Sequence, residues 1–256
     1  MAEEQISDSK EEKFRLIVSK TNSFLEQLAL DECQMHLLEQ EKIKPTLRIN
    51  YFKKPAVVFG FFKRINEEIN IENCKRFNVD VCRTLNNADT FYKEPNSEIN
   101  CSLIVNDSNI NIPLDLIGSY ERIFSLISKT LENYNIKAEF KPLNEVLVNK
   151  MRIALIVQFR KKGVVLFNFS ILISLNKEEI KKFLINTRLL DKGLTSLDEK
   201  TKNRIEQKDV EKSLIESFPK IFKTDLEKEE LTKEELTLAE EIYKEKYSTH
   251  DWIYYK

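Results

Sequence analysis

Four short apolar runs follow one another closely along the chain, at residues 136–140, 145–149, 152–159 and 163–174. Parallel neighbours in a sheet need a crossover connection of about a dozen residues or more, and the connections between these runs are shorter. The runs therefore predict an antiparallel meander. No other feature of the sequence restricts the fold as strongly.

Further strand-like and helical segments lie on both sides of the meander. Ser23 with Glu26, and Thr232 with Glu235, have the spacing of a capping box at a helix start. The helix that follows Ser23 is expected to bury one broad apolar face. Together the segments predict an α+β fold, a mixed, largely antiparallel sheet flanked by helices. Strands are predicted at 14–19, 47–52, 56–61, 79–83 and 99–105, and helices at 24–42, 66–77, 114–134, 177–185, 208–222 and 232–246.

The character of the chain changes after about residue 196. From there, acidic and basic side chains alternate with periodic leucine, isoleucine and phenylalanine, as in amphipathic helices with a solvated charged face. We therefore expect three parts: a flexible N-terminal tail (1–12), a main domain (13–195) and a small C-terminal helical segment (196–256).

The charges of the chain nearly cancel, with 41 basic and 42 acidic residues and a net charge of -1. Such a balance indicates neither a nucleic acid nor a membrane as the partner. The N-terminal residues lack the apolar core of a signal peptide, and no apolar run is long enough to span a bilayer. The sequence therefore predicts a cytoplasmic protein.

Metal ligands and reactive nucleophiles are scarce. The chain has four cysteines without CxxC spacing, and two histidines. In a cytoplasmic protein, isolated cysteines are typically reduced core residues. We expect no metal site, and we expect Cys82 and Cys101 to be core thiols rather than activated thiolates.

A polar, turn-rich segment lies between two strand-like runs in the stretch from Val81 to Val105. In a nucleotide- or acyl-binding enzyme, such a segment is the glycine-rich loop that brings backbone amides to the ligand. This chain has only four glycines, and none of them lies in the segment. A phosphate-binding loop of the GxGxxG or Walker type is therefore not expected.

Several short motifs follow one another in a set order. They are Leu30-Asp31-Glu32, Pro45-Thr46-Leu47-Arg48-Ile49-Asn50-Tyr51, Pro55-Ala56-Val57-Val58-Phe59-Gly60, Glu68-Ile69-Asn70-Ile71-Glu72-Asn73-Cys74 and Phe167-Asn168-Phe169-Ser170-Ile171-Leu172. In this order the chain resembles the lipoate-protein ligase and octanoyltransferase family, whose members are relatives of the biotin protein ligases. The resemblance covers about residues 14–256. It implies the class II synthetase-like biotin/lipoate ligase fold.

The chain departs from this family at the residues that bind the ligand. The family's loop motif R-R-x-x-G-G-G-A-V-x-H corresponds to residues 82–92, where the second arginine is kept as Arg83 and the three glycines and the histidine are replaced. The lysine motif N-D-x-x-x-x-G-x-K-I-x-G-x-A-Q corresponds to residues 144–158, with Arg152 in place of the lysine and Lys150 and Leu155 in place of the glycines. The other kept positions are Asn100, Ser102, Asn144, Ile153 and Gln158.

In the family, the loop amides and the lysine hold an acyl carboxylate or acyl-adenylate for attack by a lysine of a lipoyl domain. The resemblance therefore implies lipoate, ATP or lipoyl-AMP as ligands. It also implies a lipoyl-domain protein or a partner ligase subunit as the partner. Arg152 stands at the catalytic position. The expected ligand-binding residues are Arg83, Asn86, Asn87, Tyr92, Asn100, Asn144 and Gln158.

The replacements favour a protein that has lost catalysis. Asn86 and Asn87 tolerate the left-handed conformation that a glycine loop needs, so the turn itself can persist. Arg152 keeps the positive charge, but its planar fork does not replace an ammonium geometrically. Asp89 places a carboxylate where an anionic ligand should bind. The leading hypothesis is a binding or accessory subunit in protein lipoylation.

Two alternatives remain open. In the first, Arg152 with Lys150 and Arg83 supports lipoate or octanoate transfer to a lysine of a lipoyl domain by an altered mechanism. In the second, the chain binds another small carboxylate or a nucleotide. The sequence also leaves open whether aromatic side chains fill the pocket, the candidates being Phe91, Tyr92, Phe167 and Phe169.

Overall fold

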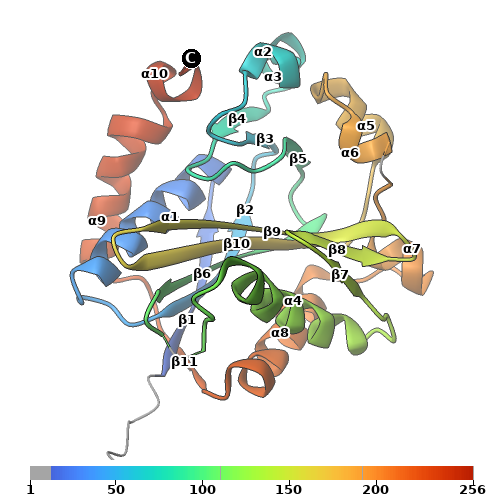
Figure 1. Cartoon of the computed structure of the whole chain (residues 1–256). Coiled ribbons are helices and arrows are strands. Elements are labelled where there is room, and N and C mark those ends of the chain that lie inside the picture. The colour runs from blue at the N-terminus through green and yellow to red at the C-terminus, as the bar shows by residue number, and fades with distance from the viewer. Residues whose placement is uncertain (1–12, 110, 192, 256) are drawn as a thin grey trace, which may run out of the picture.

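The computed structural model describes residues 13–255 except 110 and 192, so the tail predicted at 1–12 lies outside the described residues. The described residues form an eight-stranded sheet in the order β11-β1-β2-β6-β10-β9-β8-β7 (Figure 1). Its strands are β1 (Phe14–Thr21), β2 (Thr46–Phe52), β6 (Glu98–Asn106), β7 (Glu139–Lys141), β8 (Glu145–Val148), β9 (Met151–Lys161), β10 (Val164–Leu172) and β11 (Leu226–Lys228).

The predicted meander is confirmed. β7, β8, β9 and β10 pair antiparallel in chain order, and β10 also pairs antiparallel with β6. β6 is antiparallel to β2, whereas β1 is parallel to both of its neighbours, β2 and β11. The sheet is therefore mixed and largely antiparallel, as predicted.

A second, smaller sheet contains β3 (Ala56–Phe59) between β4 (Asp80–Arg83) and β5 (Phe91–Lys93). β3 is parallel to β4 and antiparallel to β5. β2 and β3 are both confirmed as strands, but they belong to different sheets. Pro55 has no N–H for a ladder with β2, and its carbonyl instead accepts a hydrogen bond from the Asp80 N–H of the small sheet.

Helix α1 (Phe24–Glu39) lies between the large sheet and helix α9 (Lys233–Ile242). Its N-terminus is capped by the Ser23 hydroxyl, which accepts from the Glu26 N–H. The prediction of one buried face is wrong, because side chains on nearly all sides of α1 are buried, including Gln27, Asp31 and Gln34. The C-terminal helices cover the side of α1 that faces away from the sheet.

The opposite face of the large sheet is covered by α4 (Leu116–Glu132) and α8 (Gln207–Phe222), which pack against each other (Figure 1). The main hydrophobic core lies between these two helices and the sheet, and includes Phe167, Ile127 and Phe218. Each such side chain contributes about 1.5–3 kcal/mol when fully buried. This core holds the strands that position the candidate site.

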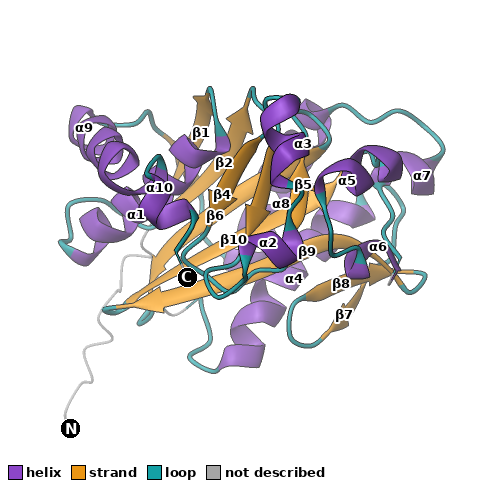
Figure 2. Cartoon of the chain, turned by 90° about the horizontal axis from the view of Figure 1, so that it is seen from above, coloured by secondary structure: helices purple, strands orange, loops and turns teal. Residues whose placement is uncertain are grey.

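Shorter helices pack beside the small sheet (Figure 2). The single helix predicted at 66–77 is wrong, because the chain forms two short helices there. Ile69 leaves the helical conformation to bridge with Leu184, and the Asn70 side chain then caps the second helix. The short helices beside the small sheet are α2 (Ile65–Glu68), α3 (Ile71–Arg76), α5 (Lys177–Phe183) and α6 (Arg188–Asp191). Helix α7 (Leu197–Thr201) instead places Leu197 in the main core.

The C-terminal segment is not purely helical. Between α8 and α9 it contributes β11 to the large sheet, and α9 continues into a π-helix, η1 (Tyr243–Tyr247), and then α10 (His250–Ile253). α10 contacts β4 of the small sheet. Within the described residues, no helix combines the length and the apolar composition that a membrane span requires.

Candidate functional site

The loop between β4 and β5 forms hydrogen bonds within itself. The side-chain oxygen of Asn86 accepts from the Thr84 hydroxyl at 3.0 Å and from the Ala88 N–H at 3.2 Å. Backbone N–H groups in such loops can bind anions. Here the Ala88 N–H instead donates to a side chain of the same loop. Neither Asn86 nor Asn87 has a positive φ. These two asparagines therefore do not adopt the left-handed conformation that they were expected to tolerate in place of glycine.

Gly60 lets this loop approach β3 closely. The Phe61 N–H donates to the Asn86 carbonyl at 2.8 Å. A Cβ on Gly60 would lie 2.4 Å from the Ala88 carbonyl oxygen and 2.7 Å from the Ala88 nitrogen. These are backbone atoms and cannot turn aside, so glycine is required at position 60 by the contact between two backbone segments.

A β-bulge directs Arg152 towards the loop. In the β8–β9 hairpin, Val146 lies opposite Ala154 and Leu147 lies opposite Arg152, so Ile153 is the additional residue. Ile153 is buried in the main core beside Val146 and Ala154. Since successive side chains alternate between the faces and a bulge re-aims them, Arg152 points to the opposite face.

Two carboxylates neutralise the Arg152 guanidinium, which is only 5% exposed. Nη2 donates to Glu145, and Nη1 donates to Asp89 at 3.4 Å. The Lys63 ammonium lies 4.0 Å from Asp89 and 3.5 Å from Glu68. Charges thus alternate from Glu145 to Glu68, and the cation at the expected catalytic position is paired within the chain.

Glu145 remains ionised in this arrangement. Burial raises the pKa of the Glu145 carboxyl, but hydrogen bonds from Lys141 and Arg152 outweigh burial and hold that pKa below its usual value. The positive charge of Arg152 is therefore compensated at neutral pH. An incoming anion would have to compete with Glu145 and Asp89 for the guanidinium.

A small cavity lies next to the loop, lined by residues of α1, of both sheets and of the loop itself. Its volume is about 50 Å³, which is room for a few waters at roughly 10–15 Å³ each. Pockets that enclose small-molecule ligands typically measure about 300–1,000 Å³. The cavity in this structure is therefore several times smaller than such pockets.

Two of the four candidate aromatic residues narrow the cavity. Phe91 lines it and packs against Leu155 and Val157, and Phe169 forms part of its wall. Phe167 belongs to the main core instead. Tyr92 lies on the other side of the small sheet and stacks on Phe183, with 4.8 Å between the ring centroids.

Lys93 is a cavity residue that the sequence patterns did not single out. Lys93 is 8% exposed, and its ammonium donates to Glu98 at 2.9 Å and to the Asn100 side-chain oxygen at 2.7 Å. Within the described residues, the Asn100 amide nitrogen has no hydrogen-bond partner. Successive side chains of β5 point to opposite faces, so Phe91 and Lys93 lie on the cavity side and Tyr92 lies on the other. This alternation was the sequence signal that could have identified Lys93 as a cavity residue.

The cavity brings together Asn86 and Asn100 from the predicted ligand-binding residues. Asn87 is exposed and Asn144 is half-buried, and neither lines the cavity. Gln158 faces α4, where its side-chain oxygen accepts from the Ser119 hydroxyl at 3.2 Å. Of the seven residues that the family resemblance suggested for ligand binding, Asn86 and Asn100 therefore line the cavity, and the others do not.

Arg83 anchors the end of the chain rather than lining the cavity. Its guanidinium donates to several backbone carbonyls, and the Trp252 indole N–H donates back to the Arg83 carbonyl at 3.1 Å. The guanidinium also lies over the Phe59 ring, 4.5 Å from its centroid. The accepting carbonyls belong to Phe61, Lys63, Trp252, Ile253 and Tyr255.

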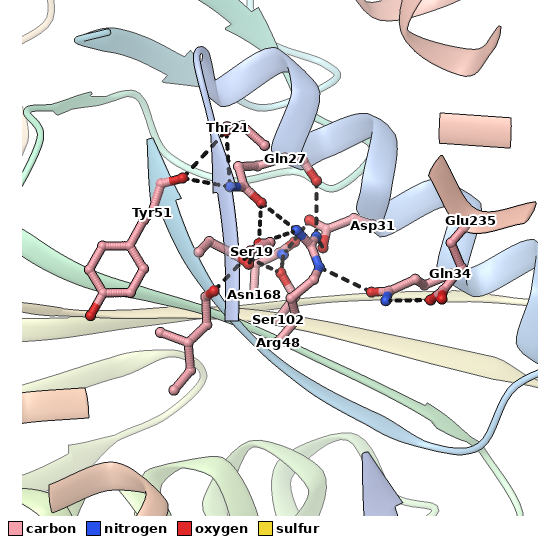
Figure 3. Close-up of polar contacts among 12 residues, drawn as sticks. Ser19, Thr21, Gln27, Asp31, Gln34, Arg48, Tyr51, Ser102, Asn168 and Glu235 are labelled. Carbon is pink, nitrogen blue, oxygen red and sulfur yellow. Dashed lines mark hydrogen bonds and ion pairs between the residues drawn. The ribbon is translucent and has the colours of Figure 1, made fainter. Parts of the chain in front are cut away.

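A buried polar network begins at the loop with Asn86 and continues through Asn168, Asp31 and Arg48, of which Figure 3 shows the last three. Asn86 donates to Asn168 at 3.3 Å, and Asn168 donates to Asp31 at 2.8 Å. Asp31 in turn accepts from Arg48, and both of these side chains are buried. Three residues of the sequence motifs, Asp31, Arg48 and Asn168, are therefore structural partners of the loop.

The network continues to the C-terminal segment. Arg48 donates to the Gln34 side-chain oxygen at 3.0 Å, and the Gln34 amide donates to Glu235 of α9 at 3.0 Å (Figure 3). Glu235 also accepts two hydrogen bonds from Arg15 of β1, at 3.0 Å and 3.2 Å. One hydrogen-bonded path thus joins the loop, the sheet, α1 and α9.

All four cysteines are buried and free. Burial raises the pKa of the Cys33 thiol to about 12 and that of Cys74 to about 11, and it raises the thiol pKa of Cys82 and Cys101 as well. A buried thiol of high pKa carries little thiolate at neutral pH. The prediction that the cysteines are core thiols is confirmed.

The family model described as the lipoyl protein ligase A/B catalytic domain matches residues 23–219. This chain belongs to that family. The octanoyltransferase LipM of Brevibacillus brevis is 25% identical over 273 residues, which are 94% of this chain and 98% of the relative. The octanoyltransferase LipM of Bacillus subtilis is 23% identical over 275 residues, which are 95% of this chain and 98% of the relative.

A solved structure shares the fold of this lipoyl protein ligase family member. It is a bi-partite lipoate protein ligase, studied with its E2 lipoyl domain, from Thermoplasma acidophilum. It has a TM-score of 0.82 and 19% identity, and the match covers 95% of this chain and 96% of that chain. The expected lipoate-protein ligase fold is therefore confirmed.

Proposed function

We propose that this chain is a non-catalytic member of its family and acts in protein lipoylation as a binding or accessory subunit. The observation that carries the proposal is the pairing of Arg152. The residue at the family's lysine position donates to Glu145 and Asp89 and is almost fully buried. A cation paired in this way attracts a substrate anion only if the ligand displaces a carboxylate.

The loop and the cavity support the same proposal. The Ala88 N–H donates to the side-chain oxygen of Asn86 and is therefore not free for a ligand anion. The cavity of about 50 Å³ is narrowed by Phe91 and Phe169. Acyl transfer requires the reacting groups to be held together in a defined geometry. A chain that does not enclose the acyl group lacks this contribution to the rate.

The proposed partner is a lipoyl-domain protein or an active ligase subunit. The Thermoplasma acidophilum relative is named as a bi-partite ligase and was studied with an E2 lipoyl domain, and this chain matches nearly its whole length. The proposed location is the cytoplasm, where cysteines remain reduced. Four free, buried cysteines are compatible with such a compartment.

The second candidate function is acyl transfer to a lysine of a lipoyl domain. It is favoured by the full-length match to relatives named octanoyltransferase. In that case Arg152 would supply the positive charge near the acyl group, and the loop at 84–90 would have to open to admit it. Such an enzyme could not rely on the cysteines, because their thiols are buried and have raised pKa values.

The test combines a transfer assay with a binding titration. The full chain is incubated with ATP, lipoate or octanoate, and a panel of lipoyl domains, and the mass of each domain is measured. The same domains, and an active lipoate ligase, are titrated against the chain by calorimetry. We expect binding of a lipoyl domain or of the ligase, with no acyl group added by this chain alone.

The control separates chemistry at Arg152 from a general effect of charge. Arg152→Ala is compared with Arg160→Ala, which removes an exposed arginine from the same strand. Acyl transfer that is lost in the first variant and kept in the second would make the chain an enzyme. If the chain binds neither a lipoyl domain nor the ligase, the accessory role is ruled out as well.

A further inference from the structure

The outer edge of β1 is only partly covered. On one side, β2 pairs with β1 from Arg15 to Thr21. On the other side, β11 pairs only with Phe14, Arg15 and Leu16, and the Glu229 N–H adds one more bond to the Leu16 carbonyl at 3.0 Å. Within the described residues, no strand lies beside residues 17–21 on that side.

The backbone groups at this edge point towards an open groove. The Arg15 N–H donates to Pro45, on the β2 side, whereas the Leu16 carbonyl accepts from Glu229, on the β11 side. Because the backbone groups of successive strand residues point to alternate sides, those of Val18 and Lys20 are directed away from β2. An unpaired row of this kind is a template for another strand.

A groove lies beside the uncovered part of β1. It is lined by residues 17–20 of β1, by the first turns of α8 and by the connection from β11 to α9. Its volume is about 1670 Å³, which exceeds the roughly 300–1,000 Å³ of small-molecule pockets. The pairing of β11 with β1 ends at Leu16 and the groove lining begins at Ile17, so an added strand would continue the line of β11 along β1.

The side chains around the groove indicate what kind of segment would fit. Leu236 of α9 is 53% exposed on one wall, next to Leu231. Carboxylates outnumber cations along the lining, so a basic segment is favoured over an acidic one. The carboxylates are Glu94, Asp198, Glu206, Asp209, Glu211 and Glu230, and the cations are Lys20, Arg204, Lys208 and Lys228.

We propose that an extended, basic segment of a partner protein adds to the free edge of β1 as a further strand of the large sheet. Main-chain hydrogen bonds to Val18 and Lys20 would supply affinity, and alternate side chains would contact Leu236 and the carboxylates. Residues 17–21 offer an edge of roughly 16 Å at about 3.3 Å per residue. This surface is separate from the cavity and does not depend on whether the chain catalyses acyl transfer.

The test uses short synthetic peptides that alternate lysine with valine, titrated against the full chain by fluorescence anisotropy. A peptide that alternates glutamate with valine has the same strand propensity and the opposite charge. We expect the basic peptide to bind more tightly by at least about tenfold, which corresponds to roughly 1.4 kcal/mol. Hydrogen exchange of the Val18 and Lys20 amides should slow when the peptide binds.

Two variants locate the binding surface. Val18→Pro removes one edge donor, and proline is tolerated on an edge strand when its nitrogen faces outwards. Leu236→Ala removes the apolar contact and leaves the strand intact. Each should weaken peptide binding by about tenfold or more. The matched control is Leu116→Ala, because Leu116 is 49% exposed on α4 and lies outside the groove. This variant should bind the peptide as tightly as the parent.

Three results would overturn the proposal. The first is that the basic and acidic peptides bind equally, or that neither binds up to millimolar concentration. The second is that binding persists unchanged in Leu236→Ala while the variant keeps the melting temperature of the parent. The third is that sedimentation shows a dimer that Val18→Pro dissociates, in which case the edge pairs with a second copy of this chain.

Discussion

Arg48 of β2 and Asp31 of α1 form an ion pair whose side chains are 0% and 4% exposed. Removal of one partner would leave the other charge buried without compensation, which typically costs about 3–5 kcal/mol. We therefore expect Asp31→Ala to lower the free energy of unfolding by that amount in urea denaturation. Glu67→Ala removes an exposed pair with Arg64 and should cost about 1 kcal/mol or less. Equal effects of the two variants would contradict the structural role of the network.

Arg83→Ala should release the C-terminal residues from the small sheet. Trp252 is the only tryptophan of the chain, so its fluorescence reports on α10 directly. In the parent, the indole N–H donates to the Arg83 carbonyl and the ring contacts Phe61 and Tyr247. We expect the emission of the variant to shift to longer wavelength as the indole becomes hydrated. Unchanged emission would mean that α10 docks without the Arg83 side chain.

Glu235 should make the fold sensitive to acid. Burial raises the pKa of the Glu235 carboxyl, but hydrogen bonds from Arg15, Gln34 and the Thr232 N–H lower it by more. A group whose pKa is lowered by folding stabilises the fold above its unfolded pKa of about 4.3. That stabilisation is lost as the pH falls through the folded pKa.

Glu235→Gln tests this pH dependence. The variant should be less stable than the parent at pH 7, and its stability should fall less steeply below about pH 4.3. The measurement is the urea midpoint as a function of pH. Glu121→Gln, on the exposed face of α4, is the control and should follow the parent. Parallel curves for the parent and Glu235→Gln would contradict the assignment.

Gly60→Ala should destabilise the chain although φ is not positive at this position. The added Cβ would meet the backbone of Ala88 at 2.4 Å, so the loop between β4 and β5 must move. Overpacking of this kind costs about 1–3 kcal/mol. Thermal unfolding should therefore occur at lower temperature, and amide exchange in the loop should become faster. A variant as stable as the parent would show that the loop yields freely.

Phe91→Ala should enlarge the cavity enough to admit an acyl chain. Complete truncation of a buried phenylalanine costs about 3–5 kcal/mol. Phe91 is only half-buried, so its loss should cost less. We expect octanoate to raise the melting temperature of the variant and not that of the parent, because only the variant has room to bind it. Tyr92→Ala is the matched control, since Tyr92 lies on the other side of β5 and lines no part of the cavity.

Much of the fold was predictable because it depends on local patterns. The short connections between the four strands of the meander admit only antiparallel pairing. Ser23 and Thr232 do cap the first turns of α1 and α9, as their spacing predicted. The break at Ile69 was not predictable, because a bridge to Leu184, far along the chain, interrupts the helix.

The order of the motifs located the candidate site, but the contacts within the site come from residues far apart in the chain and were not predicted. The resemblance pointed to Arg152 and to the loop at 84–90, and the structure brings Asp89 of that loop to the Arg152 guanidinium. It did not predict that a bulge at Ile153 turns Arg152 towards Glu145 and Asp89. The number of residues in one strand opposite another depends on how the two strands pair, and this pairing forms only in the folded sheet.

By itself, the sequence determined the family, the antiparallel meander and the identity of the residues at the altered site, because motif order, strand period and glycine content are properties of the chain. The tertiary structure decided which of these residues meet. It directed Arg83 to the C-terminal carbonyls and Lys93 into the cavity, and it left part of the β1 edge open. The physical reason is that charge pairing, cavity volume and free edges depend on segments distant in the chain, whose packing local patterns do not specify.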